Sequence, residues 1–130
     1  MIRKIVFIAL VVFISCDFSK QSEQKSEIQM LSERITQNPK DIYLLYDRVA
    51  YNKAKHNLGS VLFDLKEIIR LDSLNPNNHN NIAKVYFDLS KGKNPDPKYP
   101  SLVKYHLDKS IQININNKES HALMGELLLA

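Results

Sequence analysis

The chain has 130 residues, 44% of them hydrophobic and 25% charged, a composition typical of one modest folded domain. With only three glycines and no tryptophan, the sequence argues against a glycine-rich nucleotide-binding fold and against a turn-rich β-sandwich. The net charge is +4, but the basic residues are scattered rather than clustered among aromatic residues, so no nucleic-acid partner is expected.

The first 15 residues (1–15) predict a secretory signal peptide. Arg3 and Lys4 precede an uninterrupted apolar run at residues 5–14. A helix of that length measures about 15 Å, roughly half of the hydrocarbon thickness of a bilayer, so the run is too short to remain as a membrane span. A short apolar run behind a basic start is the pattern of a signal that directs export.

The residues that follow the apolar run resemble the bacterial lipobox. In Phe13-Ile14-Ser15-Cys16, apolar residues and a small residue precede the only cysteine of the chain, although Phe13 replaces the usual leucine. The resemblance implies cleavage after Ser15 and acylation of Cys16 by fatty acids such as palmitate. The alternative is an ordinary signal peptide with an incidental cysteine.

Lipidation would anchor the chain, because two or three buried acyl chains hold a protein firmly on a membrane. Residues 16–26, which begin with Cys16, are otherwise polar and aperiodic and predict a flexible tether. We therefore expect an exported protein of the bacterial cell envelope that is attached to a membrane, with the outer membrane favoured over the inner one.

The rest of the chain, residues 27–130, predicts an all-α domain of about six amphipathic helices, because apolar residues recur three and four positions apart. The apolar stripes lie at residues 28–35, 44–52, 61–71, 82–89, 102–113 and 122–129. The segment 91–100 contains Pro95, Pro97 and Pro100, which predict an exposed loop without helix. This loop is either a recognition element or a tolerated surface insertion.

The predicted helices recur with a fixed period. Asn38-Pro39 and Asp72-Ser73, which both end a predicted helix, are 34 residues apart, and so are Val49 and Ala83. Asn114-Ile115 follows Asp72-Ser73 by 42 residues, which is the same period plus an eight-residue insertion at the loop. A shared register with one localised insertion indicates a repeated pair of helices.

A helix–turn–helix unit of 34 residues is that of the tetratricopeptide repeat (TPR), and residues 27–130 resemble this family. The resemblance rests on residues 47–50 with 68–73, on 81–86 and on 123–127, although Ser73 replaces the usual proline and Asn52 the usual tyrosine. It implies a TPR-like α-solenoid of antiparallel helix pairs with about 2.5 repeats. The alternative is an unrelated helical bundle.

The same resemblance implies a concave groove lined by the first helix of each pair. It places these residues in the groove: Tyr43, Tyr46, Ala50, Lys53, Asn77, Asn80, Lys84, Phe87, Glu119, Ala122 and Glu126. Their mixture of aromatic, amide and oppositely charged groups suits an extended peptide or a helix better than an anion. The alternative is an ordinary solvated helix surface.

The expected function is that of a membrane-anchored protein–protein interaction module that binds a peptide or protein partner in this groove. The alternative is a structural subunit of a larger envelope complex. An enzyme is not expected, because no Ser/His/Asp or Cys/His set shares a helix face, and neither a cofactor nor a small-molecule substrate is expected. The four histidines, His56, His79, His106 and His121, lack the spacing of a zinc site, so no metal is expected.

The last predicted helix is apolar up to Ala130, whereas a solenoid usually finishes with a polar capping helix. We therefore expect either a truncated gene or an end that packs on a partner or on a second copy of the chain.

Overall fold

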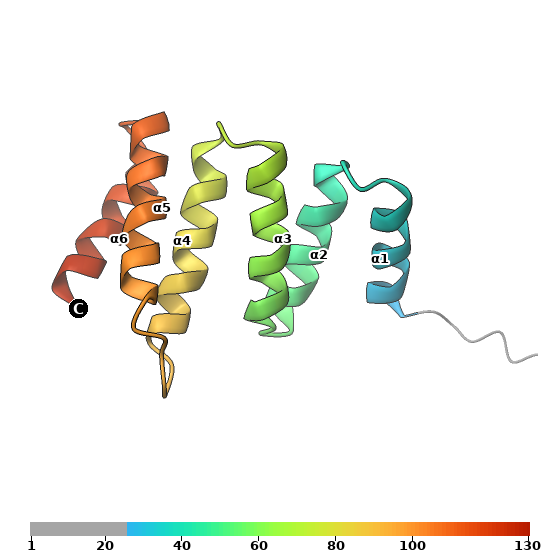
Figure 1. Cartoon of the computed structure of the whole chain (residues 1–130), viewed down its shortest axis with the longest axis horizontal. Coiled ribbons are helices and arrows are strands. Elements are labelled where there is room, and N and C mark those ends of the chain that lie inside the picture. The colour runs from blue at the N-terminus through green and yellow to red at the C-terminus, as the bar shows by residue number, and fades with distance from the viewer. Residues whose placement is uncertain (1–25) are drawn as a thin grey trace, which may run out of the picture.

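The computed structural model describes residues 26–130, which fold into six α-helices and contain no β-strand. The helices are α1 (Glu27–Gln37), α2 (Ile42–Ala54), α3 (Leu58–Leu71), α4 (Pro76–Ser90), α5 (Tyr99–Ile113) and α6 (Lys118–Leu129). Each helix runs antiparallel to the preceding one and packs against it (Figure 1). The predicted all-α class is confirmed, and each predicted apolar stripe falls within one helix. The predicted signal peptide, Cys16 and all but the last residue of the tether lie outside the described residues.

Side-chain caps fix where most of the helices begin. At α1, the Gln29 N–H donates to Ser26 Oγ at 3.4 Å and the Ser26 N–H donates to Gln29 Oε1 at 2.8 Å, which together form a capping box. Four later helices follow a residue whose side-chain oxygen accepts a backbone N–H of the first turn: Asp41, Asn57, Asn75 and Asn117. Each cap satisfies an N–H group that a helix start leaves unpaired, which contributes about 1 kcal/mol to stability.

Three of the turns between helices have the same geometry. Asn38, Asp72 and Asn114 follow α1, α3 and α5, and the N–H of each donates to the carbonyl four residues earlier at 2.9, 2.8 and 2.9 Å. Their φ angles lie between −140° and −133° and their ψ angles between 69° and 100°. The capping residue of the next helix follows three positions later in each case. The period in the sequence therefore coincides with a recurring backbone turn.

The other two connections differ from each other in length. Residues 55–57 join α2 to α3, and His56 adopts a left-handed φ of 54° there. Residues 91–98 form a longer, exposed connection between α4 and α5. The expectation that Pro100 excludes helix is wrong, because it lies in the first turn of α5, where its missing N–H breaks no helical hydrogen bond.

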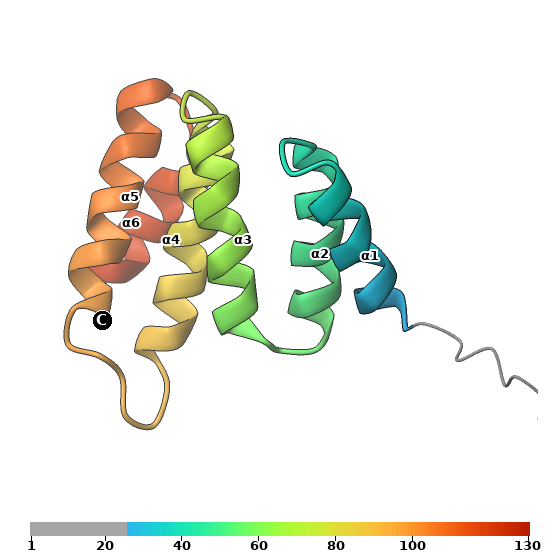
Figure 2. The same ribbon diagram turned by 45° about the vertical axis from the view of Figure 1, so that its right-hand side comes forward.

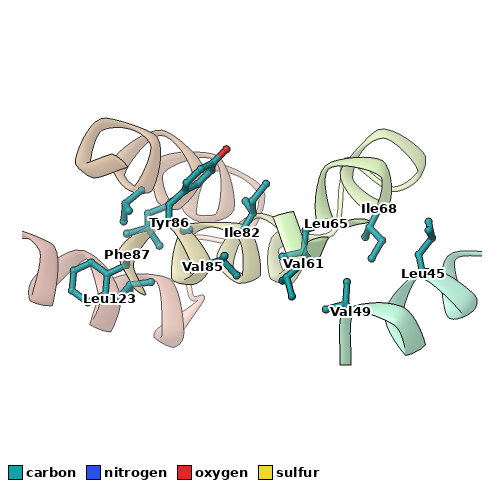
Figure 3. Close-up of a cluster of buried hydrophobic side chains, with 13 residues drawn as sticks. Leu45, Val49, Val61, Leu65, Ile68, Ile82, Val85, Tyr86, Phe87 and Leu123 are labelled. Atoms are coloured by element: carbon teal, nitrogen blue, oxygen red, sulfur yellow. The ribbon is translucent and has the colours of Figure 1, made fainter. Parts of the chain in front are cut away.

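The core is one continuous cluster of apolar side chains that extends from α2 to α6 (Figure 3). Its members with 0% exposed surface are Val61, Leu65, Ile68, Ile82, Ala83, Val103 and Leu107. α4 lies at the centre of the packing and contacts α3, α5 and α6 (Figure 2). Because α4 is held by three neighbours, it forms a fixed frame against which α6 is positioned.

The six helices have 11 to 15 residues each. Within residues 26–130, none of them combines the length and the apolar character that crossing a bilayer requires.

Candidate binding groove

A hollow of about 420 Å³ lies between α4 and α6, and we call it the α4/α6 hollow. It is lined by six residues that the sequence places in a groove: Asn80, Lys84, Phe87, Glu119, Ala122 and Glu126. Three further residues complete the lining: Asp88, Lys91 and Leu123. Phe87 is 5% exposed and Leu123 is 9% exposed, so the two provide an apolar floor below the charged rims. Both side chains belong to the end of the core cluster where α4 meets α6 (Figure 3).

Charged side chains stand on both rims of the α4/α6 hollow. α4 contributes Lys84, Asp88 and Lys91, and α6 contributes Glu119 and Glu126. The outer two residues on each rim are seven positions apart, about two helical turns, and therefore share one face of their helix. All five are exposed, and none of them forms an ion pair within residues 26–130. Their charges are available to an incoming ligand.

A lysine ammonium group lies on the face of the Phe87 ring. The Lys91 ammonium lies 3.9 Å from the centroid of this ring, a cation–π contact. Lys91 is the C-cap of α4 and the first residue of the exposed connection 91–98. The ring face at the floor of the hollow therefore accepts a positive charge, and the residue that supplies it comes from the surface.

A chain of buried hydrogen bonds holds α6 against α4 and α5. Asn80 Nδ2 donates to Ser120 Oγ at 2.9 Å, and Ser120 Oγ donates to Ser110 Oγ at 2.7 Å. Ser110 Oγ in turn donates to the Pro76 carbonyl at 2.8 Å. Satisfied polar networks of this kind, away from water, fix the relative orientation of the elements that they join. Asn80 thus supports the frame of the hollow, and one of the two N–H groups of its amide is already used.

On α2, Tyr46 is half-buried and bonded to α4. Its hydroxyl donates to Asn78 Oδ1, and Asn78 Nδ2 donates to the Asp72 carbonyl at 3.0 Å. Burial raises the pKa of Tyr46, and the Asp72 carboxylate raises it further, so the hydroxyl stays protonated and remains a donor. Tyr46 therefore connects α2 to α4 instead of presenting a free hydroxyl to a ligand.

The remaining predicted groove residues lie outside the α4/α6 hollow. Tyr43 is 77% exposed on α2, and Lys53 is exposed near the end of the same helix. Asn77 Oδ1 accepts a hydrogen bond from Asn117 Nδ2 at 3.4 Å, which ties the start of α4 to the residue that caps α6. Ala50 lines a separate hollow of about 480 Å³ between α1 and α2. The structure thus brings six of the predicted residues of α4 and α6 together and leaves Asn77 and the residues of α2 outside the hollow.

Two lining residues that were not predicted for the groove, Asp88 and Lys91, could have been found from helical periodicity. Asp88 follows Lys84 by four positions and Lys91 follows Phe87 by four, so each pair shares a helix face. Lys91 is not predicted as a groove residue because the sequence assigns it to the proline-rich loop 91–100. Leu123 lies in the predicted apolar stripe 122–129, and in the structure it belongs to the core cluster.

The lining of the α4/α6 hollow contains carboxylates and amines but no serine, cysteine or histidine. Elsewhere, His79 of α4 and His106 of α5 bring their Nδ1 atoms within 3.1 Å of each other. In the part of the chain that the structure describes, no three His, Cys, Asp or Glu residues gather as metal ligands would. The geometry of the hollow suits recognition of a ligand that is partly apolar and partly charged.

Comparisons with protein-family models, with curated proteins and with solved structures find no match to this chain. The fold and the site define an all-α protein with a preformed, charged hollow between two helices, and its function is inferred from that geometry.

Proposed function

We propose that the chain is a membrane-anchored protein–protein interaction module of the bacterial cell envelope that binds a peptide or protein partner on α4 and α6. The observation that carries the proposal is the α4/α6 hollow, with its apolar floor and its unpaired charges. Buried hydrogen bonds hold the two helices in place before a partner arrives. A preformed site loses less conformational entropy on binding than a flexible one.

In this proposal the helix pairs form a TPR-like solenoid. The recurring turn at Asn38, Asp72 and Asn114 supports it, because these residues follow the 34-residue period with its single insertion. The antiparallel packing of each helix on the preceding one also supports it (Figure 2). In such a solenoid the first helices of successive pairs line one face, and these would be α2, α4 and α6.

The proposed anchor is lipid on Cys16, as the Phe13-Ile14-Ser15-Cys16 pattern implies. The segment 17–25 extends at most about 30 Å, so the helical domain would work close to the membrane. An envelope protein that shares this membrane surface is the expected class of partner, with the outer membrane favoured.

Site-specific cross-linking tests the binding proposal. A photoreactive phenylalanine replaces Ala122, which is exposed in the α4/α6 hollow, in the full chain expressed in its native cells. A matched chain carries the same group at Ser101, which is exposed on α5 outside the hollow. After irradiation of intact cells, we expect a discrete protein adduct from position 122 and none from position 101. The absence of an adduct at 122, or the same adducts from both positions, would contradict the proposal.

A structural subunit of a larger envelope complex is the second candidate. It is favoured by a separate hollow of about 590 Å³ between α1 and α3, where Phe63 is 71% exposed beside Ile35 and Leu45. A permanent subunit buries such apolar surface against its neighbour and aggregates when it is expressed alone. Light scattering of the purified chain distinguishes the candidates: aggregation that Phe63→Ser relieves favours the subunit, and a monodisperse chain favours the transient module.

A further inference from the structure

We propose that the α4/α6 hollow selects a basic segment of its partner, in which an arginine or lysine side chain lies on the Phe87 ring and faces Glu119 and Glu126. This inference rests on the proposed function and adds the chemistry of the ligand. It follows from the charges on the rims, from the position of Lys91 and from the size of the hollow.

The charges of the hollow favour a cation. The rims carry three carboxylates and two ammonium groups. The α6 rim is uniformly acidic, since only Ala122 and Leu123 line the hollow between Glu119 and Glu126. This acidic site stands out in a chain whose net charge is +4. Because neither glutamate has an ion-pair partner among residues 26–130, a basic ligand gains both without breaking an existing pair.

Lys91 marks the place of the ligand's cation. Its ammonium occupies the face of the Phe87 ring at 3.9 Å and forms no ion pair with the carboxylates of the rims. Since Lys91 begins an exposed connection, its side chain can leave the ring while the core stays intact. A ligand cation then replaces one cation–π contact with another and gains the attraction of Glu119 and Glu126.

The dimensions of the hollow define what accompanies the basic residue. About 420 Å³ holds a few side chains but not an entire helix. The floor beside Phe87 is formed by Leu123, which is 9% exposed and offers an apolar contact. The fitting ligand is therefore a segment in which a bulky apolar residue adjoins an arginine or lysine.

Peptide titration with the full chain in non-ionic detergent tests the inference. The probe is a fluorescein-labelled peptide with alternating arginine and leucine at its centre, and two matched peptides carry glutamate for arginine or serine for leucine. Fluorescence anisotropy gives the Kd. We expect the basic peptide to bind at least tenfold more tightly than the acidic one, and added salt to weaken its binding.

Three variants of the chain separate the contributions. Glu119→Gln with Glu126→Gln should weaken binding of the basic peptide by about tenfold, because two attractive charges are lost. Lys91→Gln should tighten binding by about threefold, because it removes the competing cation. The control, Glu27→Gln with Asp47→Asn, makes the same charge change at the α1/α2 hollow and should leave the Kd within about twofold. All the altered side chains are exposed, so circular dichroism should show unchanged helix content.

Several outcomes would overturn the inference. These are a Kd above about 1 mM for the basic peptide, equal binding of the acidic peptide, an unchanged Kd in the glutamate variant, and an equal loss in the control. Cross-linking from position 122 in cells then shows whether the proposed function fails together with this inference. If its adduct persists, the ligand chemistry is wrong and the interaction module stands, whereas the loss of both results removes the proposed function as well.

Discussion

Arg48 of α2 forms a two-point ion pair with Asp64 of α3. Nε donates to Oδ2 at 2.9 Å and Nη2 donates to Oδ1 at 2.6 Å, while Nη1 reaches Ser32 Oγ on α1 at 3.3 Å. The Asp64 side chain is 1% exposed and that of Arg48 is 17% exposed. The pair therefore joins the first three helices through one guanidinium that is largely shielded from water.

Breaking this pair on one side should be costly. Arg48→Met leaves the Asp64 carboxylate buried without its partner, and we expect the free energy of unfolding to fall by about 3 kcal/mol. The double variant Arg48→Met with Asp64→Leu removes both charges and should recover most of that loss. Urea unfolding followed by circular dichroism checks both values. A double variant as unstable as the single one would show that the packing of Arg48, rather than its charge, is what matters.

The turn between α2 and α3 offers a stabilising substitution. His56 is exposed and has a φ of 54°, a conformation that costs a residue with a Cβ about 1–2 kcal/mol. His56→Gly removes this cost, and part of the gain is offset by the greater freedom of glycine in the unfolded chain. We expect a net stabilisation of about 0.5–1 kcal/mol, measured as a higher urea midpoint at unchanged slope. His56→Val serves as the opposite control and should destabilise the chain.

The helices could be predicted from the sequence because their apolar stripes and caps are local properties. Pro100 is the exception in the loop prediction, since its effect depends on whether it falls inside a helix or in its first turn. Pro100 is tolerated because α5 begins at Tyr99, and the start of that helix depends on how α5 packs against α4. A count of prolines does not contain this information.

The candidate site could be predicted only in part. Periodicity identifies the face of α4 on which Lys84 and Phe87 lie. It does not reveal that the amide nitrogen of Asn80 donates a hydrogen bond to Ser120 Oγ. That bond joins two residues 40 positions apart, so it depends on how α4 and α6 pack together. For the same reason, Tyr46 is predicted as a contact residue and is found in a bond to Asn78. Sequence patterns assign faces, whereas tertiary packing decides which polar groups remain free.

The anchor can be tested by a single-atom change. Cys16→Ser replaces the proposed acceptor sulfur with oxygen, so we expect no incorporation of labelled palmitate and loss of the chain from membranes in a flotation gradient. The physical reason is that membrane attachment depends on buried acyl methylenes, each contributing about 0.8 kcal/mol. Ser22→Ala, in the same predicted tether, is the control and should float like the original chain. A serine variant that still floats with membranes would contradict lipid anchoring.

The contact between His79 and His106 predicts a loss of stability in acid. Their Nδ1 atoms are 3.1 Å apart, a hydrogen bond that requires at least one of these nitrogens to be unprotonated. Burial lowers the pKa of His79, and Lys109 lowers it further. Burial, followed by the charges of His79 and Lys66, lowers the pKa of His106 from 6.5 to about 4. The His106 ring also stacks on Tyr86 and meets the edge of Tyr105, so the neutral ring is part of the packing between α4 and α5.

The direction in which stability changes with pH follows from the lowered pKa values of the two histidines. Above about pH 6.5 the ring is neutral in both the folded and the unfolded chain, and the stability is complete. As the pH falls from 6.5 to about 4, the unfolded chain takes up the proton before the folded chain does, so His106 should remove about 1–2 kcal/mol of stability once screening by solvent at this partly exposed ring is included. His106→Phe keeps an aromatic ring without the titrating nitrogen, and urea unfolding at several pH values should show a shallower decline for this variant. Parallel curves for the two chains would mean that His106 binds its proton equally in the folded and the unfolded chain over this range.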